Sequence, residues 1–163
     1  MPAYTRILMP IDGSPTSDKA LVEAIRLARI SGARLRLLHV VDELSYVDGF
    51  EPAMNYLRDS VPLMRQAGER LLAQFCQKAA DQGVETDRVL MVGGPGRLWE
   101  SVVEQAASMG ADLIVVGSHG RRGVGRALMG SDAEQIVRHA PVSVLVVRDA
   151  AAAGSHAGPI PPA

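Results

Sequence analysis

Apolar residues along this chain fall into two alternating patterns. Short continuous runs, typical of strands buried on both faces, alternate with stretches in which apolar residues recur at the spacing of an amphipathic helix. The continuous runs cover residues 6–11, 35–41, 89–92, 113–116 and 142–147. Because strands that alternate with helices pair in parallel through right-handed crossovers, the pattern predicts an open α/β sheet.

Turn-forming residues mark where several of these elements begin and end. Pro10 cannot donate to a sheet ladder, so we expect the first strand to end there. Ser14 is positioned to cap the first helix, with Pro15 as its first residue. The first three helical stretches each lead to a glycine that favours a C-terminal turn, Gly32, Gly83 and Gly110.

Residues 43–62 are the least regular part of the sequence. Aromatic residues stand there among Pro52, Pro62 and other turn formers, which predicts a loop or a broken helix, with regular helical spacing from Leu63. Connections of this length are uncommon, and two roles stay open: a lid or partner surface, and a structural cover over the sheet. We assign residues 1–148 to a single domain and expect the small, Pro-rich residues 149–163 to be a disordered tail.

Composition and charge narrow the class of protein. The chain has 163 residues, 47% of them hydrophobic and 21% charged, which suits one globular domain. Its formal net charge of −1 excludes a generally basic nucleic-acid-binding protein. The single cysteine, Cys76, indicates a reducing compartment, and no apolar run approaches the about 18 residues of a membrane span. We therefore expect a cytoplasmic protein with no nucleic-acid or membrane partner.

A basic, glycine-rich segment follows the fourth apolar run. Residues 117–131 read GSHGRRGVGRALMGS, with five glycines, three arginines and no acidic residue. Glycines let backbone N–H groups approach a ligand closely, and the helix starting at Ser131 adds unpaired N–H groups and the positive end of a dipole. Because ligands bind open parallel sheets at the carboxyl ends of strands, Asp12 and Val41 are expected nearby. The arrangement is typical of phosphate binding.

Two phosphate-binding motifs fit this segment incompletely. Residues 125–131 have the spacing of a P-loop, but Ser131 stands where the phosphate-binding lysine is required. Gly123 and Gly125 begin a dinucleotide fingerprint, but Leu128 occupies the third glycine position.

The sequence gives little support for a catalytic triad or for a metal site. Ser118, His119 and Asp12 are the residue types of a hydrolase triad, but no nucleophile-elbow motif surrounds the serine. The four histidines do not have the spacing of metal ligands, so whether the site holds a metal stays unknown.

A longer signature matches in full. Gly117-x-x-Gly120 is followed after nine residues by Gly130-Ser131, the pattern G-x2-G-x9-G-S/T. Further matching segments are Asp12-Gly-Ser14, residues 38–42 (LHVVD), residues 111–120 (ADLIVVGSHG) and residues 140–142 (APV). On these residues the chain resembles the universal stress protein family over roughly residues 4–148.

The resemblance implies a fold and a partner. Members of this family have a Rossmann-like, adenine nucleotide alpha hydrolase-like fold, a five-stranded parallel sheet in the order 3-2-1-4-5 with helices on both faces. They are typically cytoplasmic homodimers that pair through the last strand, here Val142 to Val147, which would cover an apolar edge. Those that carry the signature bind ATP, so the implied ligand is ATP or ADP, with Mg²⁺ as a further candidate.

Carried over to this sequence, the resemblance places the nucleotide between the first and fourth strands. The residues expected around adenine and ribose are Pro10, Ile11, Asp12 and Val41. Those expected along the ribose and phosphates are Val116, Gly117, His119, Gly120 and Arg121, then Met129, Gly130, Ser131 and Asp132 at the phosphate chain.

Three of these residues have a second interpretation. Ser131 and Glu134 form a capping-box pattern that would satisfy the helix start without a ligand. Asp12 has the position of a turn-fixing residue. Asp132 either helps to hold Mg²⁺ or weakens triphosphate binding through its charge.

The expected function is a stress-response protein that binds ATP or ADP as a sensor or regulatory module. No general base positioned to activate water is recognisable, so hydrolysis is expected to be slow at most. Two alternatives stay open: a ligand-free dimeric interaction scaffold, and an enzyme that acts on an adenylated or phosphorylated substrate through Asp12 or His119.

Overall fold

The computed structural model describes residues 3–42, 52–93, 98–119 and 129–148, in which strands and helices alternate. The strands are β1 (Arg6–Pro10), β2 (Arg34–Asp42), β3 (Thr86–Gly93), β4 (Leu113–Gly117) and β5 (Ser143–Val147). The helices are α1 (Pro15–Ser31), α2 (Pro52–Ala80), α3 (Leu98–Met109) and α4 (Ser131–His139). The predicted strands are confirmed, with β3 three residues longer than expected at its start. The predicted tail, residues 149–163, lies outside the described residues.

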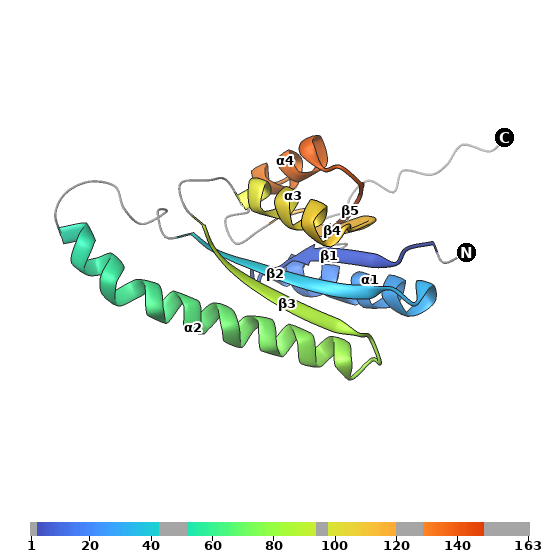
Figure 1. Cartoon of the computed structure of the whole chain (residues 1–163), viewed down its shortest axis with the longest axis horizontal. Helices are drawn as coiled ribbons and strands as arrows, with labels where there is room; N and C mark the ends of the chain where they lie inside the picture. Colours follow the sequence, from blue (N-terminus) through green and yellow to red (C-terminus); the bar gives the residue numbers. More distant parts are fainter. Residues whose placement is uncertain (1–2, 43–51, 94–97, 120–128, 149–163) are drawn as a thin grey trace, which may run out of the picture.

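The strands form one parallel sheet in the order β3-β2-β1-β4-β5, as the resemblance implied. Helices α1 and α2 cover one face, and α3 and α4 cover the other (Figure 1). Side chains of β1 alternate between the two layers: Ile7 and Met9 pack under α1 and α2, and Leu8 packs under α3 and α4. All three are fully buried, which explains why this strand is continuously apolar in sequence.

The first helix begins and ends where the sequence predicts. The Ser14 hydroxyl accepts a hydrogen bond from the Ser17 N–H at 3.1 Å, and Pro15 is the first helical residue. Gly32 closes the helix in the left-handed conformation at φ 68°. These local signals fix where the chain leaves β1 and re-enters the sheet.

The second helix is longer than predicted. It starts at Pro52 and continues through Pro62, so the expectation of a loop or broken helix over residues 52–62 is wrong. A proline interrupts only its own N–H bond and the turn before it, and Pro62 lies on an exposed side of the helix. Pro52 stands at the N-terminal end, where proline is favoured. Residues 43–51 lie outside the described residues. None of the described helices is both long and apolar enough to cross a membrane.

Asp112 joins β1 to β4 at the end of the sheet where these strands begin. Its carboxylate accepts hydrogen bonds from the Thr5 N–H and hydroxyl, both at 2.7 Å, and from the Arg6 N–H at 3.1 Å. The Asp112 N–H donates in turn to the Arg6 carbonyl at 3.0 Å. Burial tends to raise the pKa of Asp112, but the hydrogen bonds outweigh it and hold the pKa below its usual value.

Replacing Asp112 by alanine should lower the free energy of unfolding by about 1–3 kcal/mol at neutral pH, because three acceptor contacts are lost. Since the folded-state pKa is depressed, this contribution is present above about pH 4 and is lost as pH falls through the folded-state value. Urea unfolding of both proteins from pH 7 to pH 2.5 measures the difference.

The exposed Asp81, whose carboxylate accepts a hydrogen bond from Gln77 within one helical turn, provides a control. Asp81→Ala should change stability by about 0.5 kcal/mol or less. An Asp112→Ala penalty that does not shrink in acid would contradict the assignment.

Candidate functional site

The carboxyl ends of β1 and β4 lie at the point where the strand order reverses, which is where open α/β sheets have their ligand-binding crevice, and we call this place the crevice. From β1 the chain crosses through α1 to β2, and from β4 it crosses through α4 to β5, so the strand order reverses between β1 and β4. The ladder between β1 and β4 ends at the pair Leu8–Ile114, whereas that between β1 and β2 continues to Pro10–Leu38. Within the described sheet, the last residues of β1 thus pair with β2 but not with β4. Open α/β sheets bind ligands at such a position.

Backbone contacts hold the residue after β1 against β2. The Ile11 N–H donates to the Leu38 carbonyl, and the Ile11 carbonyl accepts from His39 Nδ1, each at 2.8 Å. Because a carbonyl only accepts, this contact places a proton on Nδ1. A Cβ on Gly68 of α2 would lie 2.7 Å from His39 Cδ2, so α2 packs directly on the ring. His39 is therefore a structural residue that positions the end of β1.

Asp12 shapes the turn into α1. Its Oδ1 accepts a hydrogen bond from the Ser14 N–H at 2.9 Å, an Asx turn, and its own N–H donates to the Ser17 hydroxyl at 3.4 Å. The turn-fixing interpretation of Asp12 is thus confirmed. It does not exclude a ligand role, because the side chain is half-buried and retains solvent access at the crevice.

Gly117 brings the end of β4 against the start of α1. A Cβ at this position would lie 2.9 Å from Thr16 Cγ2 and 3.2 Å from both the carbonyl carbon and the oxygen of Thr16. The first contact is closer than real Cβ atoms approach, so the absence of a side chain allows this packing. Gly117 therefore has a structural requirement that is independent of any ligand.

Ser118 anchors both ends of the glycine-rich segment. Its N–H donates to the Val147 carbonyl at 2.8 Å, and its carbonyl accepts from the Gly130 N–H at 2.7 Å. The segment that leaves β4 after Ser118 thus returns to the same strand end, which places Gly130 and the start of α4 beside the crevice.

The helix start differs from the capping-box expectation. Gly130 is the N-cap of α4 and Ser131 is its first helical residue, so Ser131 does not cap the helix. Glu134 accepts a hydrogen bond from Arg138 at 3.1 Å one turn further on. Because glycine has no side chain with which to satisfy the first-turn N–H groups, this helix start offers its donors and its positive dipole end to an anion.

His119 follows Ser118 at the carboxyl end of β4. Its Nδ1 lies 2.9 Å from the Ser118 hydroxyl, and its Nε2 is buried with no hydrogen-bond partner in the described structure. A buried nitrogen of this kind is costly unless something pairs with it. Ser118 itself is 2% exposed and its hydroxyl faces this histidine, so among the described residues it is not presented as an exposed nucleophile.

Most residues of the predicted site meet at this crevice. Those from the ends of β1 and β4 and the start of α4 are Pro10, Ile11, Asp12, Val116, Gly117, His119, Met129, Gly130, Ser131 and Asp132. Val41 is buried at the carboxyl end of β2, the strand next to β1. Gly120 and Arg121 lie outside the described residues.

Sequence reasoning missed the residues that support the site. Thr16 and Ser17 form the wall and the turn behind Asp12, and both are buried. They carried a usable signal, since two small hydroxyl residues in the first turn of a helix suit close contact with a glycine at the end of a strand. The contact of His39 with the Ile11 carbonyl carried no sequence signal, because its partner is a backbone group.

Comparisons with known proteins agree with this geometry. The family model described as universal stress protein family matches residues 3–148. The chain belongs to the universal stress protein family. Universal stress protein MJ0531 of Methanocaldococcus jannaschii is 33% identical to it over 145 residues, which is 89% of this chain and 82% of that relative.

Solved structures of the family share the fold. Universal stress protein UspA from Lactobacillus plantarum superposes with a TM-score of 0.78 at 27% identity, covering 89% of this chain and 98% of that one. A universal stress protein in complex with cAMP superposes with a TM-score of 0.63 at 25% identity, covering 90% of this chain and 98% of that one. Some neighbours in this family are thus nucleotide complexes.

Gly117→Ala should lower the free energy of unfolding by about 1–3 kcal/mol, because the new methyl group meets the Thr16 backbone and cannot be relieved by a rotamer change. Thermal or urea unfolding measures the loss. Gly93→Ala is the matched control at the end of β3, where the closest atom is Val40 Cγ1 at 3.3 Å and the closest backbone atom is the Val41 carbonyl oxygen at 3.5 Å. Equal penalties at the two glycines would contradict the packing argument.

Proposed function

We propose that this protein is a cytoplasmic stress-response module that binds ATP or ADP in the crevice between β1 and β4 and acts as a sensor or regulator. The observation that carries the proposal is the start of α4. Its N-cap is a glycine, and the Gly130 N–H bond to Ser118 holds it at the strand end where ligands of such sheets bind.

The described residues fit the parts of a nucleotide. Ile11 and Val41 are buried apolar side chains that suit a base, and the Asp12 carboxylate suits a ribose hydroxyl. Backbone N–H groups at Ser131 and Asp132 suit phosphate oxygens, and the buried His119 Nε2 would gain a hydrogen-bond partner in a phosphate oxygen. Gly120 and Arg121 complete the proposed set.

The proposal favours binding over catalysis. The Ser118 hydroxyl is buried, and the Asp12 carboxylate accepts a backbone hydrogen bond in its turn. Neither is arranged to activate water, so hydrolysis is expected to be slow. No group of three His, Cys, Asp or Glu side chains suited to a metal gathers among the described residues. Mg²⁺ would therefore enter bound to the phosphates, with Asp132 at the adjoining helix start.

Calorimetric titration with ATP tests the proposal, and Gly130→Val is the decisive variant. Gly130 has φ −60° and ψ 151°, a conformation that valine adopts, so the fold should be retained. The isopropyl group would stand where the phosphates meet the helix and should weaken binding about thirtyfold, or about 2 kcal/mol.

Ala107→Val, which adds similar bulk on an exposed position of α3, should bind ATP as the unaltered protein does. Nucleotide released on denaturing the purified protein should be ATP or ADP. A protein that is purified without nucleotide and shows no ATP binding would favour the scaffold alternative.

We further propose that the protein is a homodimer through residues Val142 to Val147. The described part of β5 forms one edge of the sheet, and its apolar side chains are only partly buried. Sedimentation should give twice the chain mass, and dilution to the monomer should increase hydrogen exchange of β5 amides. A monomer at every concentration would contradict this proposal.

A further inference from the structure

A groove lies along α1, on its side toward the C-terminal end of α2. This groove has a volume of about 880 Å³. Its lining residues are Asp18, Leu21, Val22, Ile25, Arg26, Arg29, Ile30, Lys78 and Gln82. None of them belongs to the crevice between β1 and β4.

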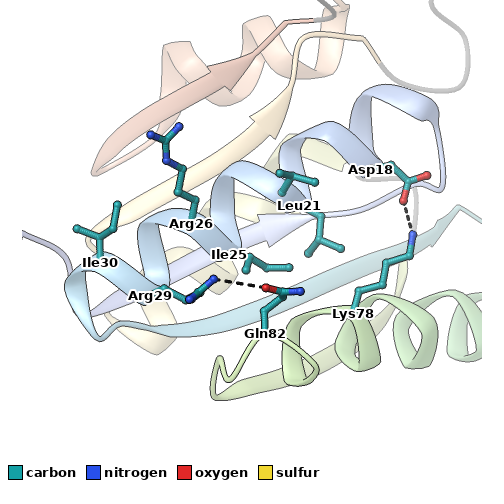
Figure 2. A pocket seen from close by; sticks show the side chains of 9 residues that line it. Asp18, Leu21, Ile25, Arg26, Arg29, Ile30, Lys78 and Gln82 are labelled. Carbon is teal, nitrogen blue, oxygen red and sulfur yellow. Dashed lines mark hydrogen bonds and ion pairs between the residues drawn. The ribbon is translucent and has the colours of Figure 1, made fainter.

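Two side-chain contacts between the helices frame the groove. Lys78 Nζ lies 2.6 Å from Asp18 Oδ1, and Arg29 Nη1 donates to Gln82 Oε1 at 3.4 Å. Between these contacts, Leu21 and Ile25 point from α1 toward α2 and form an apolar floor (Figure 2). The groove is therefore built from ordered helices.

The rim of the groove is apolar where a soluble helix is normally polar. Val22 is 64% exposed and Ile30 is 75% exposed, so two large apolar side chains of α1 face solvent. They stand one helical turn to either side of Arg26, so the three side chains form one stripe. Two exposed apolar side chains beside an apolar floor mark an interaction surface more than scattered apolar residues do.

The charge of the groove is positive. Asp18 neutralises Lys78, which leaves the guanidinium groups of Arg26 and Arg29. Within the described residues, neither guanidinium has a carboxylate partner within 4.0 Å. A ligand that fits the apolar floor and the two arginines combines apolar groups with anionic groups such as carboxylates.

We propose that this groove binds an amphipathic helix of another protein, with an apolar face bordered by Asp or Glu side chains. The groove follows α1 from Asp18 to Ile30, which is about 18 Å at 1.5 Å per residue and matches a partner helix of about three turns. Apolar side chains of the partner cover Val22, Ile25 and Ile30, and its carboxylates pair with Arg26 and Arg29.

The same charges disfavour two other occupants. A second copy packed here about a two-fold axis would bring the same patch against itself and oppose Arg26 and Arg29 to their own counterparts. Adhesion to an anionic membrane typically needs clusters of about 4–8 basic residues, and this groove offers two unpaired ones.

The test uses the full chain and two synthetic helical peptides of about four turns, each with leucines along one face. One peptide carries glutamates beside the leucines, and the other carries lysines at the same positions. Amide chemical shifts of the labelled protein report where each binds. The acidic peptide should shift residues 21–30 and 78–82, and its affinity should fall as salt is raised.

Variants assign the binding to the groove. Arg26→Glu with Arg29→Glu should weaken binding of the acidic peptide about tenfold or more, since attraction becomes repulsion at two positions. Val22→Ser with Ile30→Ser removes apolar contact at exposed positions and should also weaken binding. Arg34→Glu with Arg138→Glu is the control with the same charge change, because both arginines are exposed and lie outside the groove.

Other outcomes would overturn the proposal. Equal binding of the lysine peptide, or binding that survives reversal of Arg26 and Arg29, would rule out the charge match. Binding to phosphatidylglycerol vesicles without binding to the acidic peptide would assign the groove to a membrane surface. Self-association that disappears in Val22→Ser with Ile30→Ser would assign it to a second copy.

Discussion

The unequal pairing of β1 is the constraint on which the site depends. Its ladder to β2 continues to the last residue of the strand, whereas its ladder to β4 ends at Leu8–Ile114. Asp112 joins the two strands at their beginnings, and Gly117 lets β4 meet the start of α1 at their other end. The crevice is thus bounded by fixed backbone, and a ligand there would meet groups that are already in position.

Polar groups around the crevice divide into those that build it and those left for a ligand. Asp12 and Ser118 each make backbone hydrogen bonds that hold the chain in place. His119 Nε2 and the glycine-capped start of α4 are the groups whose hydrogen bonding a ligand would complete. Serine, histidine and aspartate therefore gather here for structural reasons as well: Ser118 is buried, and its backbone bonds hold β5 and the start of α4 in place.

The fold could be predicted because its signals are local. Continuous apolar runs mark the strands, and Ser14 and Gly32 mark the first helix. The start of α2 could not be predicted, because Pro52 and Pro62 indicate a break in the helix. The structure shows one helix that continues through Pro62. The capping error at Ser131 has a similar origin, since the glycine before it takes the cap. The structural role of Gly117 is set by contact with Thr16, about a hundred residues away in sequence, which no local pattern carries. Strand order came from family resemblance.

The central claim is that an adenine nucleotide binds between the ends of β1 and β4. Its most direct test is a titration of the isotope-labelled chain with ATP, followed by the chemical shifts of backbone amides. We expect shifts to concentrate at residues 11–12, 41, 116–119 and 129–132, with one nucleotide bound per chain. Shifts that concentrate elsewhere, along α1 and the end of α2 for example, or no shifts at saturating ATP, would contradict the account.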